Sequence, residues 1–208
     1  MHITPKTECA LAVAREYPGE LMHLEQVACV SDLLFQAFEP LHKLGPWERE
    51  MLCCGALLHD IGLSVGIAQH HKHSLRLILQ SSLPALTAEE RLIAANLGRY
   101  HRKAKPKEKH GHFRDLTSEA QEAVRRLAPI LRIADGLDRA HENAVAQIQV
   151  STARAVWTIA IYGEGDLAFA TWGGLRKAGL FEEVYGVEVR IVPKGPWLQA
   201  GPEKPGNG

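Results

Sequence analysis

Hydrophobic residues recur at helical spacing from residue 7 to about residue 140. Side chains three, four and seven positions apart share one face of a helix, so this pattern predicts a series of amphipathic helices. Proline and glycine separate them: Pro18-Gly19 closes the first, Gly62 the third and Pro84 the fourth. The predicted helices cover residues 7–17, a stretch that opens at His23, and residues 47–61, 70–82, 87–101 and 118–140.

Two segments have the form of capping boxes, in which a Ser or Thr and a Glu or Gln three positions later cap each other's backbone N–H groups. Thr87-Ala-Glu-Glu90 would open the fifth helix and Ser118-Glu-Ala-Gln121 the sixth. Pro129 falls inside the sixth helix. Proline lacks a backbone donor, so we expect a kink or a break there.

The hydrophobic period changes after residue 145. Residues 147–150, 156–162 and 187–192 alternate in the manner of strands, and residues 166–185 predict a helix that Gly173-Gly174 weakens in its middle. The sequence therefore predicts a mainly α protein. It has a helical bundle over residues 1–145, a small α+β (β-β-α-β) unit over residues 146–193, and a Pro- and Gly-rich tail over residues 194–208 that we expect to be disordered.

Composition narrows the class of protein. The 208 residues are 46% hydrophobic and 23% charged, as in ordinary globular proteins. The net charge is zero, which disfavours an overall electrostatic attraction to nucleic acid or to a membrane. The four cysteines lie in apolar patterns, and the adjacency of Cys53 and Cys54 favours reduced thiols. Because the sequence shows neither an apolar leader nor a membrane span, we expect a cytoplasmic protein. We expect no specific nucleic-acid partner and no membrane partner.

Histidine is the compositional outlier, with 11 copies, and His59 stands next to Asp60 at the end of the apolar run over residues 51–62. Burying an imidazole beside a carboxylate is costly unless both groups find partners. A divalent metal ion is the simplest partner for both. Further candidate ligands follow along the chain: His23, His70, His71, His73, His101 and Asp135.

The candidate ligands project from apolar helix faces. His59 shares a face with Leu52 and Ala56, and His101 and Asp135 have similar apolar neighbours one turn back. Helical bundles build metal sites from side chains that converge in this way. Imidazole with carboxylate suits a divalent ion such as Mn, Fe, Mg, Zn or Ni rather than calcium. An aspartate could bridge two ions, and such a centre would polarise a phosphoryl group and generate hydroxide near neutral pH.

A single histidine on an apolar stripe is more often a hydrogen-bonded core residue, but six such residues on different segments are harder to explain separately. For His71 and His73 the interpretation stays open, because one could be a ligand while both could contact phosphate or water. The remaining histidines are interpreted as surface residues: His2, His42, His110, His112 and His141.

A basic stretch runs from Arg99 to Arg114. Such a run is often only a solvated loop, but this one begins at the candidate ligand His101. Cations beside a metal site indicate an anionic substrate, and phosphate is the obvious candidate. The predicted substrate-binding residues are Lys72, Arg99, Arg102, Lys103 and Arg139.

The pattern of His23, His59-Asp60 and Asp135 resembles the signature of the HD superfamily of metal-dependent phosphohydrolases. A more specific similarity comes from ALLHDIG (56–62), HHKHSLRLIL (70–79), LPALTAEERLI (83–93), RYHRK (99–103), LRIADGLDR (131–139) and LFEEVYG (180–186). In this order they resemble the C-terminal HD-type region of the exopolyphosphatase/guanosine pentaphosphate phosphatase (Ppx/GppA) family. The similarity covers roughly residues 20–192.

This resemblance implies a ligand set. His23, His59, Asp60 and Asp135 would hold one metal ion, and Asp60 would bridge to a second ion held by His70 and His101. His70 is preferred over His71 because the small residue Ser74 follows it by four positions, as in the six-ligand HD subgroup. The resemblance also implies a limit. Family members carry their catalytic carboxylates and phosphate loops in two preceding actin-like domains, so we do not expect exopolyphosphatase activity by that route.

Three functions compete. The leading hypothesis is a stand-alone HD-type phosphohydrolase for a nucleotide, a signalling nucleotide or a short polyphosphate, with Asp60 in the catalytic centre and His73 as a candidate general acid. The alternative is a non-catalytic module that binds polyphosphate or a nucleotide and acts on a partner. A purely structural dimerisation domain leaves the buried polar residues unexplained, although exposed apolar residues and a sheet edge make a homodimer compatible with the sequence.

Overall fold

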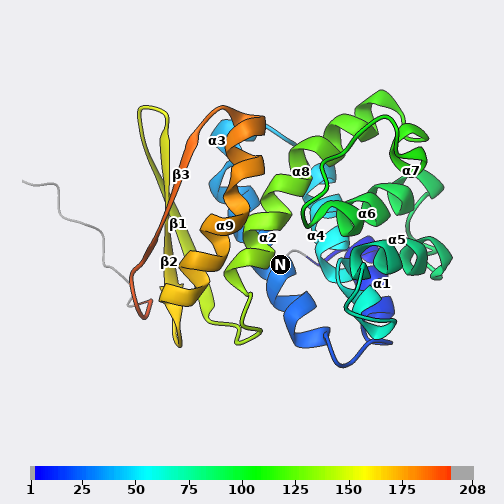
Figure 1. Ribbon diagram of the computed structural model, residues 1–208, viewed down its shortest axis with the longest axis horizontal. Helices are drawn as coiled ribbons and strands as arrows, with labels where there is room; N and C mark the ends of the chain where they lie inside the picture. Colours follow the sequence, from blue (N-terminus) through cyan, green and yellow to red (C-terminus); the bar gives the residue numbers. More distant parts are fainter. Residues whose placement is uncertain (1–2, 198–208) are drawn as a thin grey trace, which may run out of the picture.

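A computed structural model describes residues 3–197, in which a stack of helices is covered at one end by a three-stranded sheet (Figure 1). The mainly α prediction with a small β-β-α-β unit is confirmed. The elements are α1 (Pro5–Ala14), α2 (Leu21–Ala37), α3 (Glu39–His42), α4 (Pro46–Leu58), the 3-10 helix η1 (Ile61–Ser64), α5 (His70–Gln80), α6 (Ala88–Tyr100), α7 (Gly111–Arg114), α8 (Ser118–Leu137), β1 (Val145–Ala153), β2 (Val156–Gly163), α9 (Leu167–Tyr185) and β3 (Glu188–Pro193).

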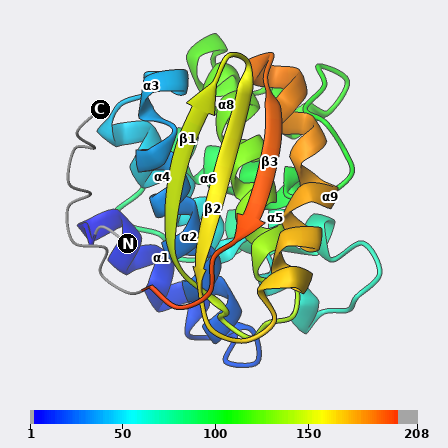
Figure 2. The same cartoon turned by 90° about the vertical axis from the view of Figure 1, so that its left-hand side faces the viewer.

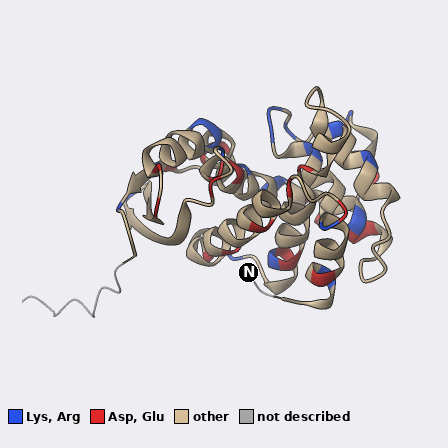
Figure 3. Ribbon diagram, turned by 90° about the horizontal axis from the view of Figure 1, so that it is seen from below, with Lys and Arg blue, Asp and Glu red and all other residues tan. Residues whose placement is uncertain are grey.

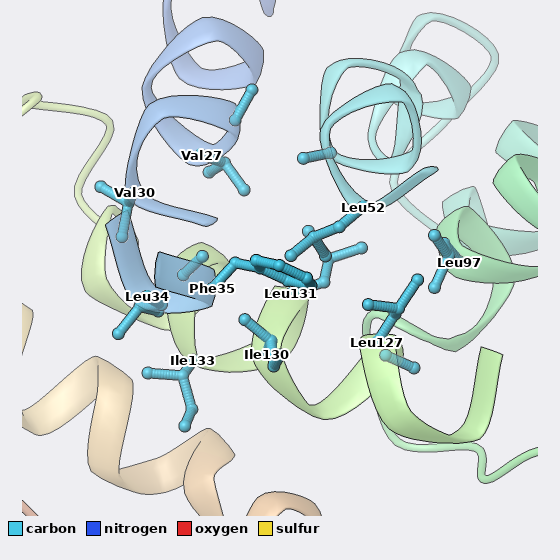
Figure 4. Packing of buried hydrophobic residues seen from close by; sticks show 14 of the residues in the cluster. Val27, Val30, Leu34, Phe35, Leu52, Leu97, Leu127, Ile130, Leu131 and Ile133 are labelled. Atoms are coloured by element: carbon cyan, nitrogen blue, oxygen red, sulfur yellow. The ribbon is translucent and has the colours of Figure 1, made fainter. Parts of the chain in front are cut away.

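The core lies between α2, α4, α6 and α8. Their apolar faces turn toward one another, so that each helix buries the stripe its sequence predicts (Figure 4). Cys53 and Cys54 are buried in α4, and all four cysteines are free thiols, as expected. The core residues labelled in Figure 4 are Val27, Val30, Leu34, Phe35, Leu52, Leu97, Leu127, Ile130, Leu131 and Ile133.

The sheet has the strand order β1-β2-β3, with β2 in the middle (Figure 2). β1 and β2 form an antiparallel hairpin whose turn contains Arg154 at a φ of 57°. β2 and β3 are parallel and are therefore joined by a crossover helix, α9. β1 packs against α2 and β3 against α9, while α9 also runs along α8. The domain boundary after residue 145 stays a prediction.

The end of α4 differs from the prediction. The helix ends at Leu58 rather than near Ile61, because Asp60 leaves the helical conformation and η1 begins after it. Gly62 fixes this turn. A Cβ atom there would lie 2.2 Å from the carbonyl oxygen of His70, and its N–H donates to the Ser74 hydroxyl at 3.0 Å. The close approach to α5 ends the helix early and turns Asp60 out of it.

The predicted capping box of α8 is wrong and the predicted break at Pro129 is absent, while a kink at Pro129 stays a prediction. The cap is Thr117, whose hydroxyl accepts from the Ala120 N–H at 3.3 Å, and the Gln121 side chain donates to the Leu116 carbonyl instead of completing a box with Ser118. The helix also continues across Pro129 without a break and ends at Leu137. Residues on both sides of Pro129 are buried, and this packing outweighs the lost hydrogen bond. The box at Thr87 and Glu90 is confirmed.

Gly173 and Gly174 do not interrupt α9, which is continuous. They are the point at which α9 crosses α8. A Cβ atom on Gly173 would lie 2.2 Å from the carbonyl oxygen of Gly136, and one on Gly136 would lie 2.5 Å from the carbonyl oxygen of Gly173. The two backbones therefore touch only because neither residue has a side chain. Of the predicted tail, residues 194–197 are described, and the expected disorder of residues 198–208 lies outside the described residues.

Candidate metal centre

Five of the predicted ligands converge in the interior, and four of them come from helix ends or the turn after α4. His23 lies in α2, His59 caps the C-terminus of α4 and Asp60 follows it. His70 is the first residue of α5, and His101 caps the C-terminus of α6. All five side chains are buried, and the folded chain thus gathers four imidazoles around one carboxylate.

The two oxygens of Asp60 face different pairs of histidines. Its Oδ2 atom lies 4.0 Å from the Nε2 atom of His23 and 3.7 Å from that of His59. Its Oδ1 atom lies 3.3 Å from the Nε2 atom of His70 and 3.2 Å from that of His101. These five residues form two groups of three that could each hold a metal ion, with Asp60 common to both.

Backbone carbonyls orient three of the rings. The Nδ1 atoms of His59 and His101 lie 2.7 Å from the carbonyl oxygens of Ala56 and Gly98. The Nδ1 atom of His70 lies 3.0 Å from the carbonyl oxygen of Ile67. A carbonyl oxygen can only accept, so each Nδ1 atom donates, and the Nε2 atom of the neutral ring is left with a lone pair. The lone pairs are turned toward Asp60.

Hydrogen-bond donors are scarce in this arrangement: among the described residues, the Arg102 guanidinium reaches the Nε2 atom of His70, at 3.3 Å. The Nε2 atoms of His70 and His101 are 3.3 Å apart, and both face an oxygen of Asp60. The Nε2 atoms of His23 and His59 and the Oδ1 atom of Asp60 are buried without a hydrogen-bond partner among the described residues. Clustered acceptors of this kind repel one another unless a cation lies between them. Two ligands on one ion, with bonds of about 2.1 Å, lie about 3 to 4 Å apart, which fits the observed separations.

Burial and charge set the protonation of the rings. Burial lowers the pKa of His59, and it lowers the pKa of His101 to about 3, so both rings are neutral at pH 7. For His23, burial acts in the same direction, but the hydrogen bond to Asp138 and the neighbouring carboxylates outweigh it and raise the pKa. The His59 and His101 rings are therefore held in the form that can bind a metal.

Asp138 and His141 hold His23 from the loop after α8. The Oδ2 atom of Asp138 accepts from the Nδ1 atom of His23 at 2.7 Å, and its Oδ1 atom accepts from the Asn143 N–H at 2.9 Å. The His141 ring stacks on His23 with centroids 3.8 Å apart and an interplanar angle of 1°. A carboxylate behind a metal-binding histidine fixes its tautomer and raises its basicity.

Asp135, the sixth predicted ligand, lies beside the two groups in the last turn of α8. Its Oδ1 atom is 3.9 Å from the Nε2 atom of His23, and its Oδ2 atom forms an ion pair with the Nζ atom of Lys177 from α9. Burial alone would raise the pKa of Asp135, but Lys177 and the nearby histidines hold it well below its usual range. Asp135 is therefore a carboxylate shared between the centre and α9.

A cleft of about 670 Å³ opens over the centre, and Asp60, His70, His101 and Asp135 lie in its wall. Acidic and basic residues are distributed over the whole chain (Figure 3), yet the cleft gathers cations from three parts of the fold. Within the described chain, Arg102, Lys103, Arg139 and Arg176 form no ion pair with a carboxylate; we call these four the basic rim. The six cations of the cleft wall are Arg102, Lys103, Arg132, Arg139, Arg176 and Lys177.

Two of these arginines organise the loop after α6. Arg132 is buried, and its guanidinium donates to the carbonyl oxygens of Tyr100, at 2.8 Å, and Ala104. Burial lowers the pKa of Arg132 to about 10, which leaves it charged at pH 7. Arg102 lies against the His70 ring, with its Nη1 atom 3.2 and 3.3 Å from the two ring nitrogens. The start of the basic stretch is thus tied to the centre.

Other predicted residues lie elsewhere. Lys72, Arg99, His71 and His73 are not among the described residues that line the cleft. His73 is half-buried, and its Nδ1 atom lies 3.4 Å from the Nη2 atom of Arg76. The Arg99 guanidinium lies over the Tyr100 ring. Burial, followed by the Arg99 charge, lowers the pKa of the half-buried His71 to about 4. Their predicted roles in substrate binding or catalysis stay predictions.

The surface interpretation of the remaining histidines is only partly correct. His42 is buried, because its two ring nitrogens pair with the Phe35 carbonyl at 2.7 Å and the Leu44 N–H at 2.9 Å. His110 and His112 are half-buried around Tyr100. His141 is exposed but lines the cleft, and His2 lies outside the described residues.

Sequence reasoning missed Asp138, Arg132, Arg176 and Lys177. Asp138 had a signal, because it follows Asp135 by one helical turn and could share its direction. Arg132 had a similar one, since it precedes Asp135 by three positions. Arg176 and Lys177 had none: they read as ordinary solvated charges on a separate helix, and only the crossing of α9 over α8 brings them to the cleft.

No helix in residues 3–197 combines the length and apolar character needed to cross a membrane.

The family comparison agrees with this architecture. The sequence model of the family described as Ppx/GppA phosphatase, domain III, matches residues 6–165. The match runs from the second residue of α1 to just beyond β2 and includes all six predicted metal ligands. The chain belongs to the Ppx/GppA phosphatase domain III family.

Proposed function

We propose that this chain is a metal-dependent phosphohydrolase of the HD type. The observation that carries the proposal is the cluster of lone pairs around Asp60, where the Nε2 atoms of His23 and His59 and the Oδ1 atom of Asp60 are buried without a hydrogen-bond partner among the described residues. A purely structural core does not need such a cluster, because hydrophobic residues of similar volume would avoid the desolvation cost of the buried polar groups. The proposed ligands are His23, His59, Asp60, His70, His101 and Asp135.

Asp60 is the proposed bridge between two ions. Its Oδ2 atom faces His23 and His59, and its Oδ1 atom faces His70 and His101, at separations that suit shared coordination. Asp135 would join the first group through its Oδ1 atom, which is the one nearer to His23. The mixed imidazole and carboxylate set suits Mn, Fe, Mg, Zn or Ni.

Divalent ions bound here would supply a hydroxide nucleophile at neutral pH and neutralise charge on a phosphoryl oxygen. The protein's own part is to orient and to attract. Asp138 and the backbone carbonyls fix the histidine rings, and the basic rim draws a phosphorylated substrate into the cleft and offsets charge that develops during transfer. Lys177 holds Asp135 ionised and in place.

The proposed substrate is a nucleotide, a signalling nucleotide or a short polyphosphate, each of which carries phosphate groups for the basic rim. A cytoplasmic location and a homodimer complete the proposal. The alternative is a binding module without turnover. Its support is the basic rim, which would attract a polyanion whether or not the centre reacts.

One experiment separates the two. Purified protein is analysed for metal content, and phosphate release is assayed from nucleotides and polyphosphates with Mn, Fe, Mg or Zn. We expect Asp60→Ala to lower the rate by a factor of about 10³ or more, because both metal groups lose their common ligand. The control is Asp115→Ala, which removes a carboxylate that is 63% exposed and is not among the residues of the cleft wall.

Circular dichroism must show that the fold of Asp60→Ala is retained. Absence of turnover with every substrate and metal, together with polyanion binding that Asp60→Ala leaves unchanged, contradicts the enzyme and supports the binding module.

A further inference from the structure

The Trp172 indole is in cation–π contact with two arginines of the cleft. The Arg139 guanidinium carbon is 5.4 Å from the centre of the indole, and that of Arg176 is 5.2 Å from it. Both arginines line the cleft over Asp60, whereas Trp172 does not. The indole is 45% exposed, and it contacts two cations at once.

The position of this group is fixed by the crossing of α8 and α9. A Cβ atom on Gly173 would lie 3.2 Å from the Cβ atom of Arg139, so the residue next to Trp172 is in contact with the segment that carries Arg139. Phe169, one turn before Trp172, stacks on the indole with centroids 5.2 Å apart. The same crossing positions Lys177 against Asp135. The crossing therefore brings the segments that carry the two arginines to the side of the metal centre.

Contact with an aromatic face leaves guanidinium donors available. The face of the indole attracts the positive charge of each arginine, while the N–H groups at the guanidinium edges stay free to bind an anion. Neither arginine pairs with a carboxylate within residues 3–197, in contrast to Arg49, which is bound to Asp32, and Arg125, which is bound to Glu108. A cation pair without an internal counter-charge is suited to an external one.

We propose that Arg139 and Arg176 form a second anion subsite in the cleft and that Trp172 is the positioning residue that holds both. This inference rests on the proposed function: the metal centre would take the reacting phosphoryl group, and the subsite a further anionic group of the same substrate. Substrates with two or more linked phosphates are then favoured over monophosphates. Trp172 acts through the arginines and does not touch the substrate.

The test measures binding without turnover. Inorganic tripolyphosphate is titrated calorimetrically into the metal-free full-length chain, so the result does not depend on metal binding or catalysis. We expect Trp172→Leu to weaken binding about tenfold, because each arginine loses its aromatic contact and must be ordered by the ligand alone. Trp172→Phe, which keeps an aromatic face, should recover most of the affinity.

Leu175→Ala is the matched control, since Leu175 lies on the same helix, is 43% exposed and is outside the cleft wall. In the Arg139→Gln/Arg176→Gln background, Trp172→Leu should have no further effect on tripolyphosphate binding, which a merely structural tryptophan would not produce. An equal loss in both backgrounds overturns the proposal. So does an unchanged affinity in Trp172→Leu, or a wild-type chain that binds no tripolyphosphate.

Discussion

The candidate metal centre and the basic rim share one cleft but are built in opposite ways. In the centre, five side chains are buried, and hydrogen bonds from their Nδ1 atoms fix all four rings. In the rim, Arg139 and Arg176 are exposed, come from different helices and have no carboxylate partner in the described chain. Backbone carbonyls orient three rings of the centre and the Asp138 carboxylate orients the fourth, while Arg139 and Arg176 of the rim contact the Trp172 indole.

Under the proposed function, this difference corresponds to two tasks. A metal centre needs fixed ligands, because coordination tolerates only small errors in distance and direction. A phosphate chain is flexible and multiply charged, so long side chains at the surface can follow it. The crossing of α8 and α9 connects the two, since Asp135 and Lys177 meet beside it.

The connection between centre and rim can be broken by one methyl group. Gly173→Ala would put a Cβ atom 2.2 Å from the carbonyl oxygen of Gly136, so the two helices must separate. We expect a loss of about 3 kcal/mol in the free energy of unfolding, measured by urea denaturation. Gly179→Ala on the same helix has open space around its Cβ position and should be neutral or stabilising by about 0.5 kcal/mol. Equal stabilities of the two variants would refute the close contact.

The orientation of His23 tests the centre separately from the rim. Asp138→Asn replaces the carboxylate that accepts from the Nδ1 atom of His23. We expect the affinity for Mn²⁺ to fall 10- to 100-fold, the usual effect of removing such a partner, in a calorimetric titration. Tripolyphosphate binding by the metal-free protein should change much less, because Asp138 is not part of the rim. If the variant binds Mn²⁺ as tightly as the wild type, Asp138 does not support the metal site.

Acid should weaken the centre more than the rim. The pKa of His101 is about 3 in the folded chain, and that of an unfolded histidine is about 6.5, so between these values the unfolded state binds the proton more readily. The contribution of the neutral His101 ring to the free energy of unfolding is therefore fully present above about pH 6.5, and it is lost as the pH falls toward 3. For the metal-free protein we expect a loss of about 2 kcal/mol from His101 between pH 7 and pH 5.

The measurement is the urea midpoint of the metal-free chain as a function of pH. His101→Gln should flatten this dependence, and Arg139→Gln in the rim should leave it unchanged. The same slope in His101→Gln and wild type would show that burial of His101 does not control the acid response.

The sequence predicted the centre better than the rim. His59 and Asp60 stand out because a polar pair follows an apolar run, and His23 and His101 project from faces that the helical period assigns to the core. The turn that separates Asp60 from α4 was missed, since it depends on Gly62 meeting α5, a contact between segments. The burial of His42 has no signal in the sequence because its partners, the Phe35 carbonyl and the Leu44 N–H, are backbone groups.

Arg176, Lys177 and Trp172 could not be assigned from the sequence. They lie in a helix more than 70 residues after His101, and the glycines that bring this helix to α8 read as weak points of the helix rather than as a contact. The helical period gives the face of a helix that is buried but not the helix against which it packs.

The proposed metal centre at Asp60 is tested most directly by anomalous diffraction from a crystal of the chain soaked in Mn²⁺. We expect two anomalous peaks, one on each side of Asp60: the first among Oδ2, His23 and His59, the second among Oδ1, His70 and His101. Absence of a peak at Asp60, with manganese bound only elsewhere on the molecule, would contradict the proposed metal centre.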